Sequence, residues 1–271
     1  MDILGFEIFP SILMGCVYLL GAYWLAVGPA RKRFRWAEEP PPSRRVASWV
    51  TAVLIIFFSL NGPLHTWADG YLFSAHMVQH LLLMLIMPPF LIYGLPPWLI
   101  RRALTLRPLY MAGRFLTHPV VAFLAYNVVF ILWHLPDMYN RALLNHNVHI
   151  TQHLSFMAVA IMMWWPVVNP VRELQRLPNG PILMAWIFLF GIPGTIVAAL
   201  ITLSNEVLYS FYAAAPRITA LGPLDDQRLG GLIMWIPGML VFWVAITVVF
   251  FRWTAVEYES WKRDPEAQSP L

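Results

Sequence analysis

Long apolar stretches alternate with short polar connections along the whole chain. A helix that crosses the hydrocarbon core of a bilayer needs about 20 mostly apolar residues. Seven stretches reach or approach that length, the second being the shortest: 8–27, 46–60, 71–93, 119–138, 148–168, 181–203 and 231–251. This pattern predicts an all-α fold, a polytopic membrane helix bundle with seven transmembrane helices.

Composition agrees with a single membrane domain. Of the 271 residues, 59% are hydrophobic and only 12% are charged. Such values are typical of integral membrane proteins and exclude an ordinary soluble domain. We expect residues 1–255 to form one seven-helix transmembrane domain and residues 256–271 to form a short cytoplasmic polar tail.

Basic residues are divided unequally between the two sets of connections. Fifteen of the 18 Lys and Arg residues lie on one side, in 28–45, 94–118, 169–180 and after the last span. The other side holds Arg141, Arg217 and Arg228. By the positive-inside rule, the N-terminus is outside and the C-terminus is in the cytoplasm. The net charge of +4 therefore reflects topology, and we expect contact with membrane lipid and no nucleic-acid partner.

Proline interrupts several of the predicted spans. Pro88 and Pro89 lie in the third, Pro193 in the sixth and Pro237 in the seventh. Proline lacks an N–H donor and so leaves a carbonyl of the preceding turn unpaired. In lipid that carbonyl needs a partner from protein or water, so we expect kinks that neighbouring groups satisfy and that can open a polar cavity.

Five of the eight histidines lie inside or at the ends of three predicted spans. His76 and His80 are four residues apart, as are His149 and His153, so each pair shares one helix face. The predicted orientation places both pairs and His134 in the outer half of the membrane. A single such histidine is usually hydrogen-bonded to a neighbour, but five that converge on one leaflet favour a metal site.

Other polar residues on the outer side are candidate contacts of that site. Asp137 follows His134 closely and is the nearest candidate carboxylate to orient a ligand or to act as a base. His65 lies in the short outer loop before the third span, and His146 lies just before the fifth. His118 alone lies on the cytoplasmic side and is excluded from the site.

An acidic and amide pair, Asp226 and Gln227, leads into the seventh span ahead of Gly230 and Gly231. An acid at a helix entrance can cap that helix. The alternative is a contact with a partner protein over the site.

The identity of the metal is open at this point. Imidazole-rich sites suit copper, zinc or iron, and the affinity order favours copper. Met77 and Met84 could supply soft thioethers for Cu(I), although such methionines more often fill space. Two histidines on facing helices could instead ligate a haem. Zinc hydrolysis is disfavoured because neither pair has the form His-Glu-x-x-His, and the single Cys16 excludes a multi-cysteine cluster.

Several motifs follow one another over about residues 45–250. They are His76-Met77-Val78-Gln79-His80-Leu81-Leu82-Leu83-Met84 with Pro88-Pro89, Trp133-His134-Leu135-Pro136 with Tyr139, His149 and His153 before Trp164-Trp165-Pro166, and Asp226-Gln227 with Gly230-Gly231 and Met234-Trp235. In these motifs the chain resembles the CtaG-type cytochrome c oxidase assembly factor family of seven-span bacterial membrane proteins. The resemblance implies a multi-pass protein of the bacterial inner (plasma) membrane that is not an enzyme and that supplies or inserts copper during maturation of haem-copper oxidases.

Three hypotheses follow. In the first, the histidines hold copper for transfer to haem-copper oxidase subunits, with a copper donor protein as a further partner. In the second, the protein is a redox membrane protein with histidine-ligated haem or iron. In the third, it is a metal-free assembly scaffold whose histidines are only hydrogen-bonded.

Overall fold

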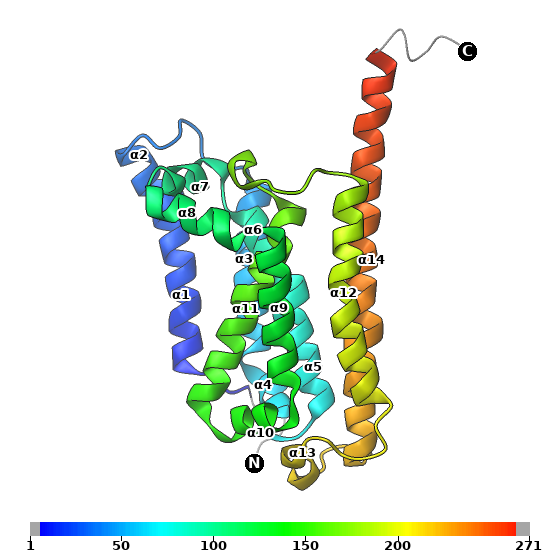
Figure 1. Cartoon of the computed structure of the whole chain (residues 1–271). Coiled ribbons are helices and arrows are strands. Elements are labelled where there is room, and N and C mark those ends of the chain that lie inside the picture. Colours follow the sequence, from blue (N-terminus) through cyan, green and yellow to red (C-terminus); the bar gives the residue numbers. More distant parts are fainter. Residues whose placement is uncertain (1–5, 264–271) are drawn as a thin grey trace, which may run out of the picture.

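The computed structural model describes residues 6–263, which form helices and their connections without a strand. Five helices are long and apolar enough to cross a bilayer, and two helix pairs, bent by 46° and 66°, bring the number to seven if each pair is one span. Figure 1 shows the long helices side by side, with α1 at one edge and α12 and α14 together at the other. The all-helical, multi-pass fold is confirmed at this level, while the orientation and the number seven stay predictions.

The first part of the chain supplies the helices on one side of the bundle. They are α1 (Pro10–Leu25) with η1 (Ala26–Ala30) and α2 (Arg31–Arg33), α3 (Ser43–Ser59), α4 (Gly62–Gly70), and α5 (Phe73–Leu81) with η2 (Leu82–Ile86) and α6 (Met87–Gly94). The π-helical turns η1 and η2 continue α1 and α5 without a loop. Two short helices, α7 (Pro97–Leu104) and α8 (Arg107–Leu116), then lie across one end of the bundle (Figure 1).

The second part completes the bundle. It contains α9 (Pro119–His134), α10 (Pro136–Leu144), α11 (His146–Val168), the 3-10 turn η3 (Arg172–Leu174), α12 (Pro181–Thr202), α13 (Ser210–Ala214) and α14 (Pro223–Arg263). Six of the described helices begin at a proline, whose fixed φ suits the first helical position and whose missing N–H costs nothing there. Proline therefore sets many of the boundaries that hydropathy alone leaves vague.

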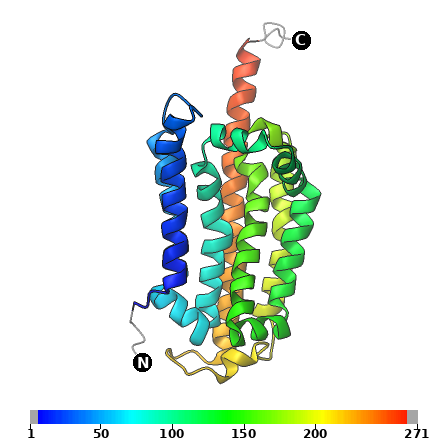
Figure 2. The same ribbon diagram turned by 90° about the vertical axis from the view of Figure 1, so that its left-hand side faces the viewer.

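The two ends of the bundle differ in charge. Figure 1 shows α2, α7 and α8, which carry many of the loop arginines, at one end, and α10 and α13 at the other. Figure 2 shows that α1 lies at an edge of the bundle when the molecule is turned by 90°. This arrangement agrees with the unequal division of Lys and Arg between the two sets of connections.

Residues 62–70 differ from the expected loop and form α4. Asn61 is extended, Gly62 has a φ of 69°, and Pro63 follows at the start of the new helix. The ring of Phe6 lies only 2.6 Å from the position that a Cβ on Gly62 would take, so the break requires a glycine. Because α4 is helical, His65 and Asp69 share one face of it.

The other departures also concern helix ends. The predicted span 119–138 is divided, because α9 ends at His134 and Pro136 starts α10. The helix predicted over 231–251 is longer and runs as α14 to Arg263. The predicted polar tail therefore begins as helix, and its part from 264 to 271 lies outside the described residues.

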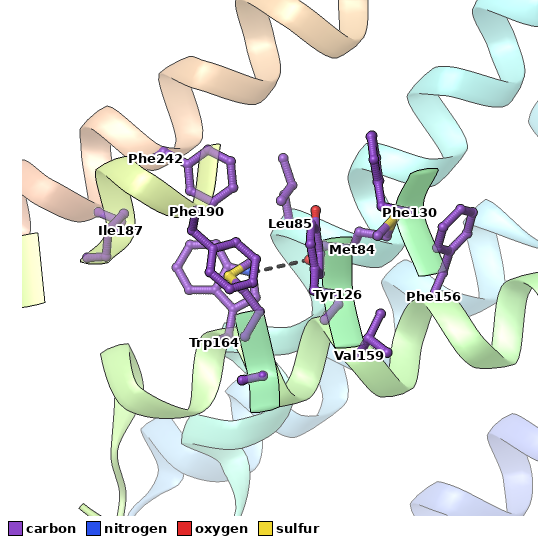
Figure 3. Packing of buried hydrophobic residues seen from close by; sticks show 14 of the residues in the cluster. Met84, Leu85, Tyr126, Phe130, Phe156, Val159, Trp164, Ile187, Phe190 and Phe242 are labelled. Atoms are coloured by element: carbon purple, nitrogen blue, oxygen red, sulfur yellow. Dashed lines mark hydrogen bonds between the residues drawn. The ribbon is translucent and has the colours of Figure 1, made fainter. Parts of the chain in front are cut away.

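The backbone carbonyl that Pro88 leaves unpaired has a hydrogen-bond partner, as expected. Pro88 has no N–H to offer the carbonyl of Met84, four residues earlier, and η2 ends at Ile86, two residues before it. The Met84 carbonyl instead accepts a hydrogen bond of 3.1 Å from the Trp164 indole on α11 (Figure 3). The prediction that protein or water would supply this partner is confirmed, and the partner is a side chain of a neighbouring helix.

Aromatic side chains fill the centre of the bundle. Figure 3 shows Tyr126 and Phe130 of α9, Phe156 of α11, Phe190 of α12 and Phe242 of α14 within one buried cluster. The Phe190 ring lies 4.7 Å from that of Tyr126, in an edge-on arrangement that aromatic rings favour. This rigid core fixes α9 and α11, which carry three of the five histidines.

Candidate metal centre

Five buried imidazoles meet near the end of the bundle that holds α10 and α13. None of the five residues is more than 8% exposed. Ring centroids lie 4.3 Å apart for His76 and His80, 4.4 Å for His149 and His153, 5.8 Å for His76 and His153, and 6.0 Å for His80 and His134. The structure thus brings the five predicted side chains together from α5, α9 and α11, while their role as metal ligands stays a prediction.

Asp226 holds the helix that carries His76 and His80. Its carboxylate accepts the N–H of Phe73 at 2.7 Å, the N–H of Ser74 at 3.2 Å and the Ser74 hydroxyl. The two N–H groups belong to the first turn of α5 and have no partner within that helix. The interpretation that Asp226 caps its own helix or meets a partner needs correction, because it is fully buried and caps α5 from α14.

Gln227 also has a structural role that differs from a partner contact. It is 1% exposed, its Oε1 accepts the Leu208 N–H at 2.7 Å and its Nε2 donates to the Glu206 carbonyl at 3.1 Å. These bonds fix the segment that leads into α13. A buried amide can pair with free backbone groups in this way wherever a connection lacks regular structure.

Tyr212 of α13 determines which nitrogen of His76 carries the proton. Its hydroxyl lies 2.5 Å from the Ala68 carbonyl, which can only accept, so the hydroxyl proton points there. Burial raises the pKa of Tyr212 well above its usual value, which keeps that proton in place. The Tyr212 oxygen then accepts from His76 Nδ1 at 2.9 Å, and the lone pair of His76 is left on Nε2.

His134 and His149 are held in the same way. His134 Nδ1 donates to the Phe130 carbonyl at 2.7 Å. His149 Nδ1 lies 3.2 Å from the Asp69 carboxylate, which can only accept when ionised. Both rings therefore keep a lone pair on Nε2, and that of His149 faces His153 Nε2 at 2.7 Å.

Imidazoles that ligate a metal usually show this pattern, with one nitrogen donating to an acceptor and the other left for the ion. One ligand atom from each of His76, His149 and His153 lies within 4.8 Å of the others, and we call these three the histidine trio. Several buried nitrogens have no hydrogen-bond partner among the described residues: His76 Nε2, His80 Nδ1 and Nε2, His134 Nε2 and His153 Nδ1. Leaving such a group unpaired costs about 1–3 kcal/mol, so a cation that accepts these lone pairs would offset a real penalty.

Asp69 is the carboxylate of the site, and the sequence analysis did not select it. It lies 3.2 Å from His149 and 3.4 Å from His65 Nε2. The Gln79 amide lies 3.0 Å from His65 Nδ1 and donates to it, which puts the His65 proton on the nitrogen that faces Asp69. The signal was present, since Gly62-Pro63 starts a helix and His65 and Asp69 are four residues apart.

Asp137 needs correction as the predicted carboxylate. It is exposed in the first turn of α10, and no hydrogen bond or ion pair joins it to a histidine within residues 6–263. Asp137 is close to His134 in sequence, but the chain turns at Leu135 and Pro136 between them, so the two side chains do not share a helix. His146 is exposed at the start of α11, whereas His118 is the N-cap of α9 at the opposite end.

A chamber of about 800 Å³ opens beside the histidine trio, and we call it the side chamber. Its polar lining includes Glu7, Ser11, His65, Thr66, Asp69, Tyr71, His146, His149 and His153. The rest of its wall is largely apolar and comes mainly from α1, α3 and α11. It reaches from the exposed His146 to the buried His153, so it connects the surface with the trio.

Comparison with known sequences identifies the family. Residues 21–255 match the family described as cytochrome c oxidase caa3 assembly factor. The chain belongs to this family. The resemblance seen in the sequence motifs is therefore confirmed.

Relatives of this chain include longer mycobacterial proteins. An uncharacterized protein of Mycobacterium leprae is 24% identical over 278 residues, covering 92% of this chain and 40% of the relative. Uncharacterized proteins of Mycobacterium bovis and Mycobacterium tuberculosis are each 25% identical over 265 residues, which cover 89% of this chain and 38% of each relative. The chain thus spans about two fifths of the length of these relatives. No solved structure matches it.

Proposed function

We propose that this assembly factor binds copper at the buried histidines and delivers it to a haem-copper oxidase subunit during oxidase maturation. The observation that supports this most is the fixed tautomer of His76, His134 and His149. Each donates Nδ1–H to a protein acceptor and keeps a buried Nε2 lone pair. His76 and His149 would hold the ion together with His153, while Asp69 and Tyr212 orient two of the rings.

Copper suits this donor set and this family. Neutral imidazoles favour copper over the harder divalent ions, and the affinity order puts copper above zinc and iron. Copper is also a metal that the oxidase client needs, so the ion is cargo and no catalytic step is required of the carrier. We place the protein in the bacterial plasma membrane with the histidines toward the outer side, where a copper donor protein could load it.

The two rival hypotheses explain the contacts less well. A haem between two axial histidines of facing helices needs an opening as wide as the porphyrin, whereas the rings of His76 on α5 and His153 on α11 lie 5.8 Å apart with His80 and His149 packed beside them. A metal-free scaffold would leave the buried imidazole nitrogens unpaired at about 1–3 kcal/mol each. A metal ion without a porphyrin needs no such opening, and it would bind the unpaired nitrogens.

Copper would reach the trio through the side chamber. Gly15 lines the chamber from α1, and a Cβ there would meet no neighbouring atom within 4 Å. Gly15→Trp should therefore slow copper uptake and copper release by the same factor, several-fold or more, without changing the equilibrium affinity. Stopped-flow transfer to and from a chromophoric Cu(I) chelator measures both rates.

Gly21→Trp is the matched control for that experiment. Gly21 lies on the same helix and is equally free of neighbours, but it does not line the chamber. Its rates should equal those of the unmodified protein. Equal rates in all three proteins would show that copper takes another route.

The proposed function itself is tested in cells that lack their own copy of this protein. Expression of the His76→Ala/His153→Ala double variant should leave the oxidase with less copper and with little activity, although the variant is present in the membrane. His118→Ala, at the other end of the bundle, should restore both. A double variant that restores full oxidase copper and activity would refute copper delivery by this site.

A further inference from the structure

A second, smaller cavity lies at His80, lined by residues of α5, α9, α12 and α14. Its volume is about 50 Å³, close to what one ion or a water or two requires. Two histidines and four methionines line it: His80, His134, Met77, Met84, Met234 and Met239. We call it the methionine cavity, and residues 6–263 place no Asp or Glu in its lining.

Glycines of the interrupted helices leave the space for these methionines. Gly191 and Gly194 of α12 and Gly238 of α14 line the cavity, next to the prolines that interrupt both helices. The Met239 sulfur lies 3.2 Å from the position that a Cβ on Gly191 would take. A larger residue at Gly191 would therefore displace that thioether, and the helix breakers of the sequence serve this cavity.

The imidazoles at this cavity have unused lone pairs. His80 is 4% exposed and His134 is 6% exposed. Both ring nitrogens of His80 lack a hydrogen-bond partner among the described residues, and so does Nε2 of His134. Packing alone accounts for the methionines but not for these unpaired nitrogens, which point to a ligand.

The donor set specifies the class of ligand. Thioethers are soft, neutral ligands that select Cu(I) over zinc and over the hard divalent ions. Without a carboxylate, the cavity also offers no charge to stabilise a divalent cation. A monovalent soft ion is the cation that imidazole and thioether groups hold best in an apolar surrounding.

We propose that His80, His134 and the surrounding methionines form a second metal site, which is selective for Cu(I) and its analogue Ag(I) and is distinct from the histidine trio. This inference rests on the proposed function. His80 joins the two sites, because its ring lies 4.3 Å from that of His76, 5.6 Å from that of His153 and 6.0 Å from that of His134. Copper that enters at the trio would thus have an adjacent soft site deeper in the bundle.

X-ray absorption of the purified full-length protein loaded with Cu(I) tests the proposal, together with Ag(I) titration. The protein should bind two ions per chain and show sulfur as well as imidazole scattering. Met84→Leu/Met234→Leu, a substitution that nearly conserves volume, should lose the sulfur signal and one equivalent of Ag(I). Met87→Leu/Met163→Leu, at two buried positions outside the cavity, should lose neither. Cys16→Ala should keep the signal, since Cys16 lies on α1 at the side chamber.

The outcomes separate this inference from the proposed function. One ion per chain with nitrogen ligands only would overturn the second site and leave copper delivery standing. Sulfur scattering that persists in Met84→Leu/Met234→Leu would likewise overturn it. A folded protein that binds no Cu(I) would overturn both.

Discussion

Replacing His76 and His153 together with alanine should weaken Cu(I) binding at the histidine trio by at least roughly a hundredfold. The loss of an outer hydrogen-bond partner already costs about 10–100-fold in metal affinity, and here two of the three direct ligands are removed. His149 alone would remain, although Asp69 still orients it. Competition with a Cu(I) chelator of known affinity, in detergent and without oxygen, measures the change.

The control for this experiment is His118→Ala. His118 lies at the other end of α9 and takes no part in the cluster, so its removal should leave the affinity unchanged. Unfolding curves of all three proteins establish that each is folded. Equal affinity in the double variant and the unmodified protein would exclude the trio as the binding site.

Asp226→Ala should give the largest loss of stability among the polar substitutions considered. Three donors at the start of α5, from Phe73 and Ser74, would lose a shared acceptor in a fully buried place. At about 1–3 kcal/mol for each unsatisfied donor, the free energy of unfolding should fall by several kcal/mol. Copper affinity should fall as well, because α5 positions His76 and His80. Thermal or denaturant unfolding in detergent measures the stability.

Asp225→Ala provides the matched control, since this neighbouring acid is exposed. It should leave the unfolding midpoint within experimental error of the unmodified protein. If both substitutions had the same small effect, the assignment of Asp226 as the cap of α5 would be wrong.

Hydropathy and helical spacing predicted much of this molecule. The apolar stretches marked the long helices, because lipid requires every span to satisfy its own backbone. The interval of four residues between His76 and His80, and between His149 and His153, placed each pair on one face. Those signals are local, and the convergence of the five rings follows from them once α5 and α11 run in the same direction and α9 runs antiparallel to both.

The polar groups that orient the imidazoles could not be predicted in the same way. Asp69 became visible only when Gly62 turned the chain into α4, against an expected loop. Tyr212 meets His76 from 136 residues away, on a short helix in a connection that has no periodicity. Asp226 was selected from its sequence, but it caps a helix 153 residues earlier and not its own. Each of these contacts depends on tertiary packing that no local pattern encodes.

The copper content of the purified protein tests most directly whether the buried histidines bind copper. The protein is incubated anaerobically with Cu(I), separated from free metal and analysed by mass spectrometry of the element, with X-ray absorption on the same sample. We expect at least one copper per chain with imidazole nitrogen in its first coordination sphere. The His76→Ala/His153→Ala variant should lose this copper. A folded, monodisperse protein that retains no copper would contradict it.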